Sequence, residues 1–176
     1  MKKSILGSFR FLILSTLIFG GMYTVFVTGV GQLFFPNQAN GSQIVLNDQV
    51  VGSKQIGQPF EQPNYFSGRS EEVSQLSPIS EEQKQRIENR TMLELAKNPT
   101  EKMVPHDLVT ASASGVDPDI SIDAAKFQVA RIAKERELPE QTILNLIEEH
   151  SQKDWFSSRK YVNVLQLNLA LDKLKA

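Results

Sequence analysis

Two glycines have the spacing that opens a phosphate-binding loop. Gly52 and Gly57 are separated by four residues, as at the start of a P-loop. In that motif a lysine and a serine or threonine must come next, because the ammonium reaches the phosphates and the hydroxyl binds Mg²⁺. Gln58 and Pro59 stand there instead. The segment is therefore interpreted as a turn between short strands, and the chain has no nucleotide motif of its own.

Acidic side chains alternate between Asp117 and Asp123, with Asp119 between them, as ligands do in an EF-hand loop. That loop needs glycine at its sixth position and glutamate at its twelfth. The sequence has Ile122 and Gln128 there. Carboxylates beside a helix N-terminus favour the helix dipole, which explains the pattern without a metal. We predict no metal site.

Two serines, Ser112 and Ser114, are the candidate nucleophiles of a hydrolase. They lie in a run of small residues that lacks the first glycine of a nucleophile elbow. A catalytic serine also needs a base and an orienting acid. The two histidines, His106 and His150, are far apart and have no metal-ligand spacing. We predict a turn and no catalytic residues, and we keep an anchored hydrolase using one of these serines as an alternative.

The elements that carry these residues alternate between helix and strand. Apolar periodicity, capping residues and breakers define them. The predicted elements are a hairpin of residues 42–46 and 49–53, a helix from the Ser80 cap to Lys97, a strand at 108–111, a helix from the Ser121 cap to Glu137, a helix that has Pro139 at its first position, a strand at 162–164 and a terminal helix marked by Leu167, Leu171 and Leu174. The fold class expected is α+β.

The N-terminal segment is apolar over the thickness of a bilayer. No Asp, Glu, Lys or Arg occurs between Phe11 and Asn47. A hydrocarbon core of about 30 Å needs about 20 helical residues. A signal peptide usually has a shorter apolar run and a small-residue cleavage site, and a soluble core helix would not be basic at one end only. We therefore predict a basic N-terminus at 1–10, a single transmembrane helix at 11–33 and one mixed α/β soluble domain at 34–176.

Basic residues give the orientation of this span. Lys2, Lys3 and Arg10 precede it, whereas Lys54 is the first basic residue after it. The positive-inside rule then predicts a cytoplasmic N-terminus and a C-terminal domain outside. Small residues recur every four positions within the span, and they allow close helix packing in a membrane. This candidate docking face consists of Thr16, Gly20, Thr24 and Thr28.

Charge and cysteine content narrow the function classes. The net charge is −1 and there is no cysteine, so a disulfide framework and a thiolate site are excluded. The two helices between residues 121 and 150 superficially resemble a helix-turn-helix. The second of them, 139–150, contains three glutamates and no basic residue, whereas a reader of DNA needs positive charge. We predict no nucleic-acid partner, and a membrane-anchored regulator with a ligand- or DNA-binding domain is the alternative function.

Five sequence blocks together resemble a known family. They are residues 31–42, 52–60, 65–69, 109–125 (VTASASGVDPDISIDAA) and 162–172 (VNVLQLNLALD). In this order they resemble the C subunit of Kdp-type potassium-transporting ATPases, over nearly the whole chain. The positions that carry the match are Gln38, Asn40, Gly41, Ser42, Gly57, Gln58, Gly68, Arg69, Thr110, Ser112, Ser114, Gly115, Asp117, Arg131, Asn163, Asn168 and Asp172.

The resemblance implies an accessory subunit of a high-affinity potassium importer in the cell membrane. An A subunit would bind and conduct potassium, a B subunit would hydrolyse ATP, and the C subunit would act as a catalytic chaperone that raises the ATP affinity of B. ATP would thus be a cofactor of the complex. The Asp-Lys-Thr-Gly phosphorylation motif of P-type pumps is missing here. The loop after Arg69 is about a dozen residues shorter than the family pattern, which leaves any nucleotide-contacting residues unknown.

Overall fold

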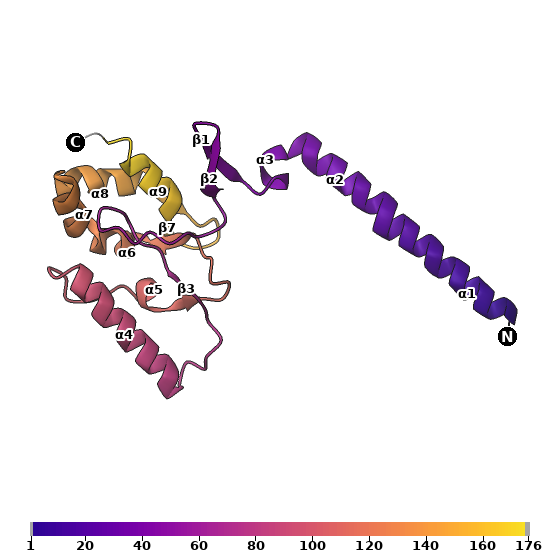
Figure 1. Ribbon diagram of the computed structural model, residues 1–176, viewed down its shortest axis with the longest axis horizontal. Helices are drawn as coiled ribbons and strands as arrows, with labels where there is room; N and C mark the ends of the chain where they lie inside the picture. The colour runs from indigo at the N-terminus through magenta and orange to yellow at the C-terminus, as the bar shows by residue number, and fades with distance from the viewer. Residues whose placement is uncertain (1, 175–176) are drawn as a thin grey trace. The chain divides into compact units, whose positions relative to one another are not determined.

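The computed structural model describes residues 2–174, and the chain forms two compact units, one up to Gln43 and one from Ile44 onward (Figure 1). The N-terminal unit is one continuous helix built from α1 (Lys2–Ser15), a π-helical stretch (Thr16–Met22) and α2 (Tyr23–Phe34). Residues from Ile5 to Phe34 are apolar and long enough to cross a membrane. Their large apolar side chains are exposed, which suits lipid rather than water. The single apolar N-terminal helix is confirmed.

The helix ends before Pro36, which has no amide to continue the hydrogen-bond ladder, and a single-turn helix, α3 (Pro36–Ala39), follows. The Asn40 side chain donates to the Pro36 carbonyl at 2.7 Å and exchanges two amide hydrogen bonds with Gln32, at 3.1 and 3.3 Å. These bonds fold the residues after α2 back onto its last turn.

The C-terminal unit opens with the predicted hairpin, β1 (Gln43–Leu46) and β2 (Gln49–Ser53). Asn47 and Asp48 form its two-residue turn with φ of 51° and 62°, the left-handed values that a type I′ turn requires. The irregular segment that follows leads into β3 (Ser70–Val73).

Helix α4 (Glu81–Lys97) begins at its predicted cap. The Ser80 hydroxyl accepts from the Gln83 amide at 3.2 Å, which satisfies one of the amides left free at the helix start. At the other end the buried Asn98 side chain donates to the Glu94 carbonyl at 3.0 Å. Both predicted ends of this helix are confirmed.

The strand predicted at 108–111 is wrong. Residues His106–Val109 form a one-turn helix, α5, with Pro105 at its N-cap. Leu108 and Val109 are adjacent and both buried, whereas a half-buried strand would bury only every second residue. The strand is the shorter β4 (Ala111–Ser112), which pairs in parallel with β3.

The helix predicted from Ser121 to Glu137 is capped by Ser121 but interrupted. It forms α6 (Ile122–Phe127) and α7 (Val129–Arg136) on either side of Gln128. Glu137 then adopts φ of 55° and ends α7. Helix α8 (Glu140–Glu149) begins one residue later than predicted, so Pro139 is its N-cap and not its first residue.

A small antiparallel sheet joins these helices. Its order is β5 (Asp119–Ser121), β7 (Lys160–Asn163) and β6 (Gln152–Lys153). The strand predicted at 162–164 begins two residues earlier, at Lys160. It ends one residue earlier, because Asn163 caps α9 (Val164–Leu171) and Val164 is already helical. Helices α7, α8 and α9 lie side by side (Figure 1). The fully buried core side chains are Phe66, Ile120, Ile132, Ile143, Ile147, Val162, Leu167 and Leu171.

Candidate functional site

Many residues of the sequence match gather in two polar centres of the C-terminal unit, and each centre fixes an irregular segment to its neighbours. In the first, the Asn168 side chain of α9 pairs with the backbone of Phe66. The Phe66 amide donates to Asn168 Oδ1 at 2.9 Å, and Asn168 Nδ2 donates to the Phe66 carbonyl at 2.9 Å. Asn168 is 1% exposed, so it supplies bonds that a buried backbone cannot obtain from water.

Gln128, at the break between α6 and α7, bonds to the same irregular segment, which connects β2 to β3. Gln128 Oε1 accepts from the Ser67 amide at 2.8 Å and from the Ser67 hydroxyl at 2.9 Å. Gln128 Nε2 donates to the carbonyls of Ser67 and Ala124, at 3.1 and 3.2 Å. Gln128 is fully buried, and these bonds satisfy both the donors and the acceptor of its side-chain amide.

Arg131 continues this centre along α7. Its guanidinium donates to the carbonyls of Tyr65 (3.0 Å) and Pro63, to Asn98 Oδ1 (3.1 Å) and to Gln128 Oε1 (2.7 Å). Burial lowers the pKa of Arg131 from its ordinary value, although an arginine remains charged at neutral pH. One side chain thus ties α4, α7 and the irregular segment together.

Asp172 closes the centre at the surface. Its Oδ2 accepts from the Tyr65 hydroxyl at 3.0 Å, and its Oδ1 pairs with Arg136 Nη2 at 2.7 Å. The Arg136 guanidinium lies 4.8 Å from the Tyr65 ring centroid. The pKa of the Tyr65 phenol is raised above its ordinary value. Desolvation is the largest cause, and the hydrogen bond to Asp172 is the second.

The second centre is organised by Arg69. Its Nη1 pairs with Asp117 Oδ2 at 2.9 Å, and its Nη2 donates to Thr110 Oγ1 and to the Thr110 and Ala111 carbonyls at 3.2–3.4 Å. The ion pair is mostly buried. Arg69 therefore joins the start of β3 to the loop that enters β5.

Tight backbone contacts surround Arg69. The Gly57 amide donates to the Val116 carbonyl at 2.8 Å. A Cβ on Gly57 would lie 2.7 Å from the Asp117 carbonyl oxygen, and a Cβ on Gly115 would lie 2.7 Å from that of Glu71. These glycines are needed for close approach of two chain segments, and a turn follows Ser53 as predicted.

The candidate nucleophiles lie in the same centre and serve its turn. The Ser112 hydroxyl is buried and accepts from the Gly115 amide at 2.9 Å. The Ser114 hydroxyl accepts from the Val116 amide at 3.2 Å. Both hydroxyls thus satisfy the backbone of one tight turn.

Asn163 links this centre to the sheet. Its Nδ2 donates to the Lys54 carbonyl at 2.8 Å and to Asp119 Oδ1 at 3.1 Å, while its Oδ1 accepts from the Gln166 amide at 3.1 Å. Burial raises the pKa of Asp119 above its ordinary value, and the Asn163 bond opposes that rise. Within residues 2–174 no group of acidic or histidine side chains is arranged to hold a metal ion.

The remaining matched residues shape turns and packing. Gln58 Nε2 donates to the Val51 carbonyl at 3.1 Å, and a Cβ on Gly68 would lie 3.7 Å from Val164 Cγ2. In the N-terminal unit, the Gln38 carbonyl accepts from the Gly41 amide at 3.1 Å. Gly41 and Ser42 have φ of 81° and 49°.

The four positions of the candidate docking face lie in two kinds of helix. Thr16 and Gly20 belong to the π-helical stretch, and Thr24 and Thr28 belong to α2. A Cβ on Gly20 would lie 3.9 Å from Thr16 Cγ2, so these two positions are neighbours on the surface. Thr16 Oγ1 donates to the Leu12 carbonyl at 2.9 Å, which leaves its methyl group for packing.

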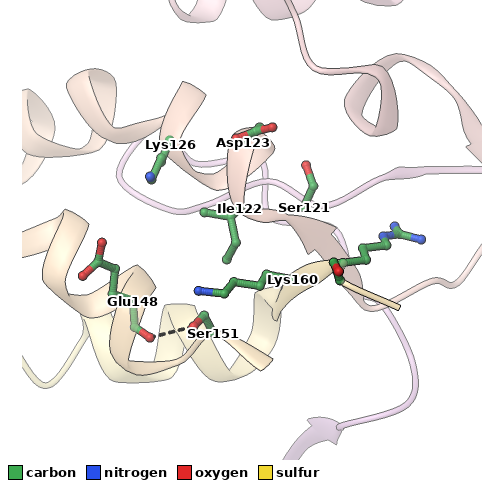
Figure 2. A pocket seen from close by; sticks show the side chains of 9 residues that line it. Ser121, Ile122, Asp123, Lys126, Glu148, Ser151 and Lys160 are labelled. Atoms are coloured by element: carbon green, nitrogen blue, oxygen red, sulfur yellow. Dashed lines mark hydrogen bonds between the residues drawn. The ribbon is translucent and has the colours of Figure 1, made fainter. Parts of the chain in front are cut away.

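Two features were missed by sequence reasoning. Arg90 on α4 donates to the Val109 carbonyl at 3.0 Å and pairs with Glu72 at 2.7 Å, beside an open cleft of about 520 Å³. A second open cleft of about 750 Å³ lies beside β7, where the ammonium groups of Lys126 and Lys160 point toward the hollow (Figure 2). Scattered surface charges give no periodic signal, so the sequence alone did not reveal either cleft.

Comparison with known proteins finds one family model, K⁺-transporting ATPase, c chain (KdpC), which matches residues 5–173. The potassium-transporting ATPase KdpC subunit of Herminiimonas arsenicoxydans is 39% identical, over 98% of this chain and 99% of that protein. The subunits of the same name from Listeria welshimeri and Yersinia enterocolitica are each 44% identical. These alignments cover 99% and 92% of this chain, and 95% and 88% of the relatives.

Proposed function

The chain belongs to the KdpC family of K⁺-transporting ATPase c chains, and we propose that it acts as a non-catalytic accessory subunit of the pump. As a KdpC subunit it has a role in potassium transport, and its candidate membrane-spanning helix gives it a membrane location. The observation that carries the proposal is that one match runs through both the apolar helix and the domain. The relatives named KdpC subunits align with 92–99% of this chain.

The two polar centres support an accessory role. Asn168, Arg131 and Arg69 use their hydrogen bonds to hold backbone segments of the domain. A domain fastened in this way offers a defined surface to a neighbouring subunit, because few interface groups must be ordered on binding. The partners would be a potassium-binding A subunit and an ATP-hydrolysing B subunit.

The orientation proposed for the chain determines how it can act. With Arg10 and the other basic residues in the cytoplasm, the domain from Ile44 onward lies outside. ATP is then out of reach of the domain. An increase in the ATP affinity of the catalytic subunit must therefore be an allosteric coupling, carried by the span and the subunits it packs against.

A titration of ATPase activity tests this role. The pump would be purified with the full chain and, separately, without it, and potassium-stimulated hydrolysis measured against ATP concentration. We expect the chain to lower the KM for ATP and to leave hydrolysis dependent on the B subunit. An unchanged KM with normal assembly would overturn the chaperone role, whereas hydrolysis by the purified chain alone would overturn the non-catalytic role.

A further inference from the structure

The hairpin between β6 and β7 ends in two adjacent, fully projecting aromatic side chains. Trp155 is 94% exposed and Phe156 is 96% exposed. Single apolar residues on a surface are ordinary. Two large aromatic rings side by side at the tip of a hairpin form an apolar projection that water does not favour.

The tip has internal bonds that hold this shape. The Asp154 carboxylate accepts from the Phe156 amide at 3.3 Å and from the Ser157 hydroxyl at 3.0 Å. The Asp154 amide donates to the Arg159 carbonyl at 3.0 Å, and the Arg159 amide donates to Ser157 Oγ at 3.2 Å. Hydrogen bonds from the Phe156 amide and the Ser157 hydroxyl also lower the pKa of Asp154.

Four basic residues lie on the hairpin or line the cleft beside it. Lys153 and Lys160 are direct partners across the β6–β7 ladder, although like charges in that position repel. Lys126 and Arg159 line the cleft beside them. Within residues 2–174, none of these four side chains forms an ion pair within 4.0 Å, and Arg159 interacts at longer range with Asp119 and Asp154.

The cleft carries both signs of charge. Asp123 and Glu148 line it together with Lys126, Arg159 and Lys160. Figure 2 shows Lys160 reaching along the hollow toward Ser151. The three cations outnumber the two carboxylates, so the cleft can offer positive charge to an anionic group.

We propose that this tip is a membrane contact, with Trp155 and Phe156 in the interfacial layer of the bilayer and the basic residues of the hairpin close to lipid phosphates. Tryptophan is enriched at that depth, because its ring is apolar and its N–H still reaches water. Basic side chains near the surface are attracted to anionic lipid. The combination of projecting aromatic rings and nearby basic side chains fits such a surface.

Tethering favours the bilayer over a freely diffusing protein as the occupant. The domain begins at Ile44, and the helix ends at Phe34. The connection spans at most about 30 Å, and a domain of this size has a radius of gyration of about 14 Å. The membrane surface is therefore always within reach at a high effective concentration. This inference goes beyond the accessory role and depends only on the membrane location.

The experiment uses the single tryptophan of the chain as its probe. The full chain would be placed in nanodiscs of phosphatidylcholine with phosphatidylglycerol, with or without brominated acyl chains. We expect Trp155 to lose more than half of its emission to the brominated lipid and to be shielded from acrylamide. The double variant Lys153→Gln, Lys160→Gln should weaken the quenching, most clearly at low salt.

A matched control moves the probe to a second exposed position. Ile79 is 85% exposed in the loop before α4, so the variant Trp155→Phe with Ile79→Trp reports any general collapse of the domain onto lipid. We expect little lipid quenching of that variant. Equal quenching at both sites, or none at Trp155, would overturn the proposal. Shielding of Trp155 only after assembly with the other pump subunits would assign the tip to a protein contact and overturn it as well.

Discussion

The two units of this chain use the same apolar residue types in opposite surroundings. In the N-terminal helix Ile18 is 47% exposed, and the neighbouring Phe19 is 70% exposed. In the domain Ile132, Ile143 and Ile147 are fully buried. The apolar helix can be recognised from composition alone, because lipid accepts every face. The domain must place each apolar side chain correctly, because water surrounds it.

Polar groups differ between the units in the same way. Thr16 in the helix donates to a carbonyl four residues earlier. In the domain, Asn168 bonds to Phe66 across 102 positions of the chain, and Gln128 bonds to Ser67 across 61. The helix satisfies its polar groups locally, whereas the stability of the domain depends on partners that are distant in sequence.

The largest difference in the free energy of unfolding should come from the same substitution, isoleucine to alanine, made in each unit. Ile147→Ala leaves a cavity in the core and should lower the free energy of unfolding of the domain by about 2–5 kcal/mol. Ile18→Ala removes the same atoms from the apolar helix and should leave that free energy unchanged. Urea denaturation of the full chain in detergent, followed by circular dichroism, measures both. Equal losses would contradict the separation of the units.

The next effect concerns the first polar centre. Asn168→Leu keeps the size of the side chain but leaves the buried Phe66 amide and carbonyl without partners. The expected loss is about 1–3 kcal/mol for each group. Asn145→Leu, on the exposed face of α8, is the control and should have little effect. Similar stabilities of the two variants would show that the Asn168 bonds contribute nothing.

A substitution on the candidate docking face should weaken assembly and leave the domain intact. Gly20→Leu adds a bulky side chain beside Thr16, where close helix packing is proposed. Co-purification with the other pump subunits should decline several-fold relative to Val25→Leu, which lies off that face. Normal co-purification of Gly20→Leu would remove the docking face from the account.

The smallest effect is a pH dependence in the domain. Burial raises the pKa of Asp119, so the folded state binds its proton more tightly than the unfolded state does. Stability should therefore fall as the pH rises through the window just above the ordinary pKa of aspartate. Asp119→Asn should flatten this dependence and be no less stable at neutral pH, as thermal unfolding from acid to neutral pH would show. An unaltered pH profile would contradict the assignment.

Local signals in the sequence predicted part of this structure. The apolar helix, the hairpin around Asn47 and the capped start of α4 at Ser80 all depend on neighbours in the chain. The α5 turn was misread as a strand because both of its apolar residues are buried. The break at Gln128 was missed because the Gln128 side chain bonds to Ser67, which lies far away in the sequence.

The candidate site shows the same limit. The family resemblance singled out Arg69, Arg131 and Asn168, but their partners became visible only in the fold. Spacing along the chain cannot show that a guanidinium bonds to the carbonyls of another segment. The exposed Trp155 and the basic residues of the cleft also share no periodic pattern.

Membrane topology tests the central claim most directly. The chain has no cysteine, so a single Gln85→Cys variant on the exposed face of α4 provides one reactive thiol. A membrane-impermeant maleimide would be applied to intact cells that make the whole pump. We predict labelling without lysis, which would support an accessory domain outside that acts through the span. Labelling only after permeabilisation would put the domain in the cytoplasm and contradict the proposed coupling.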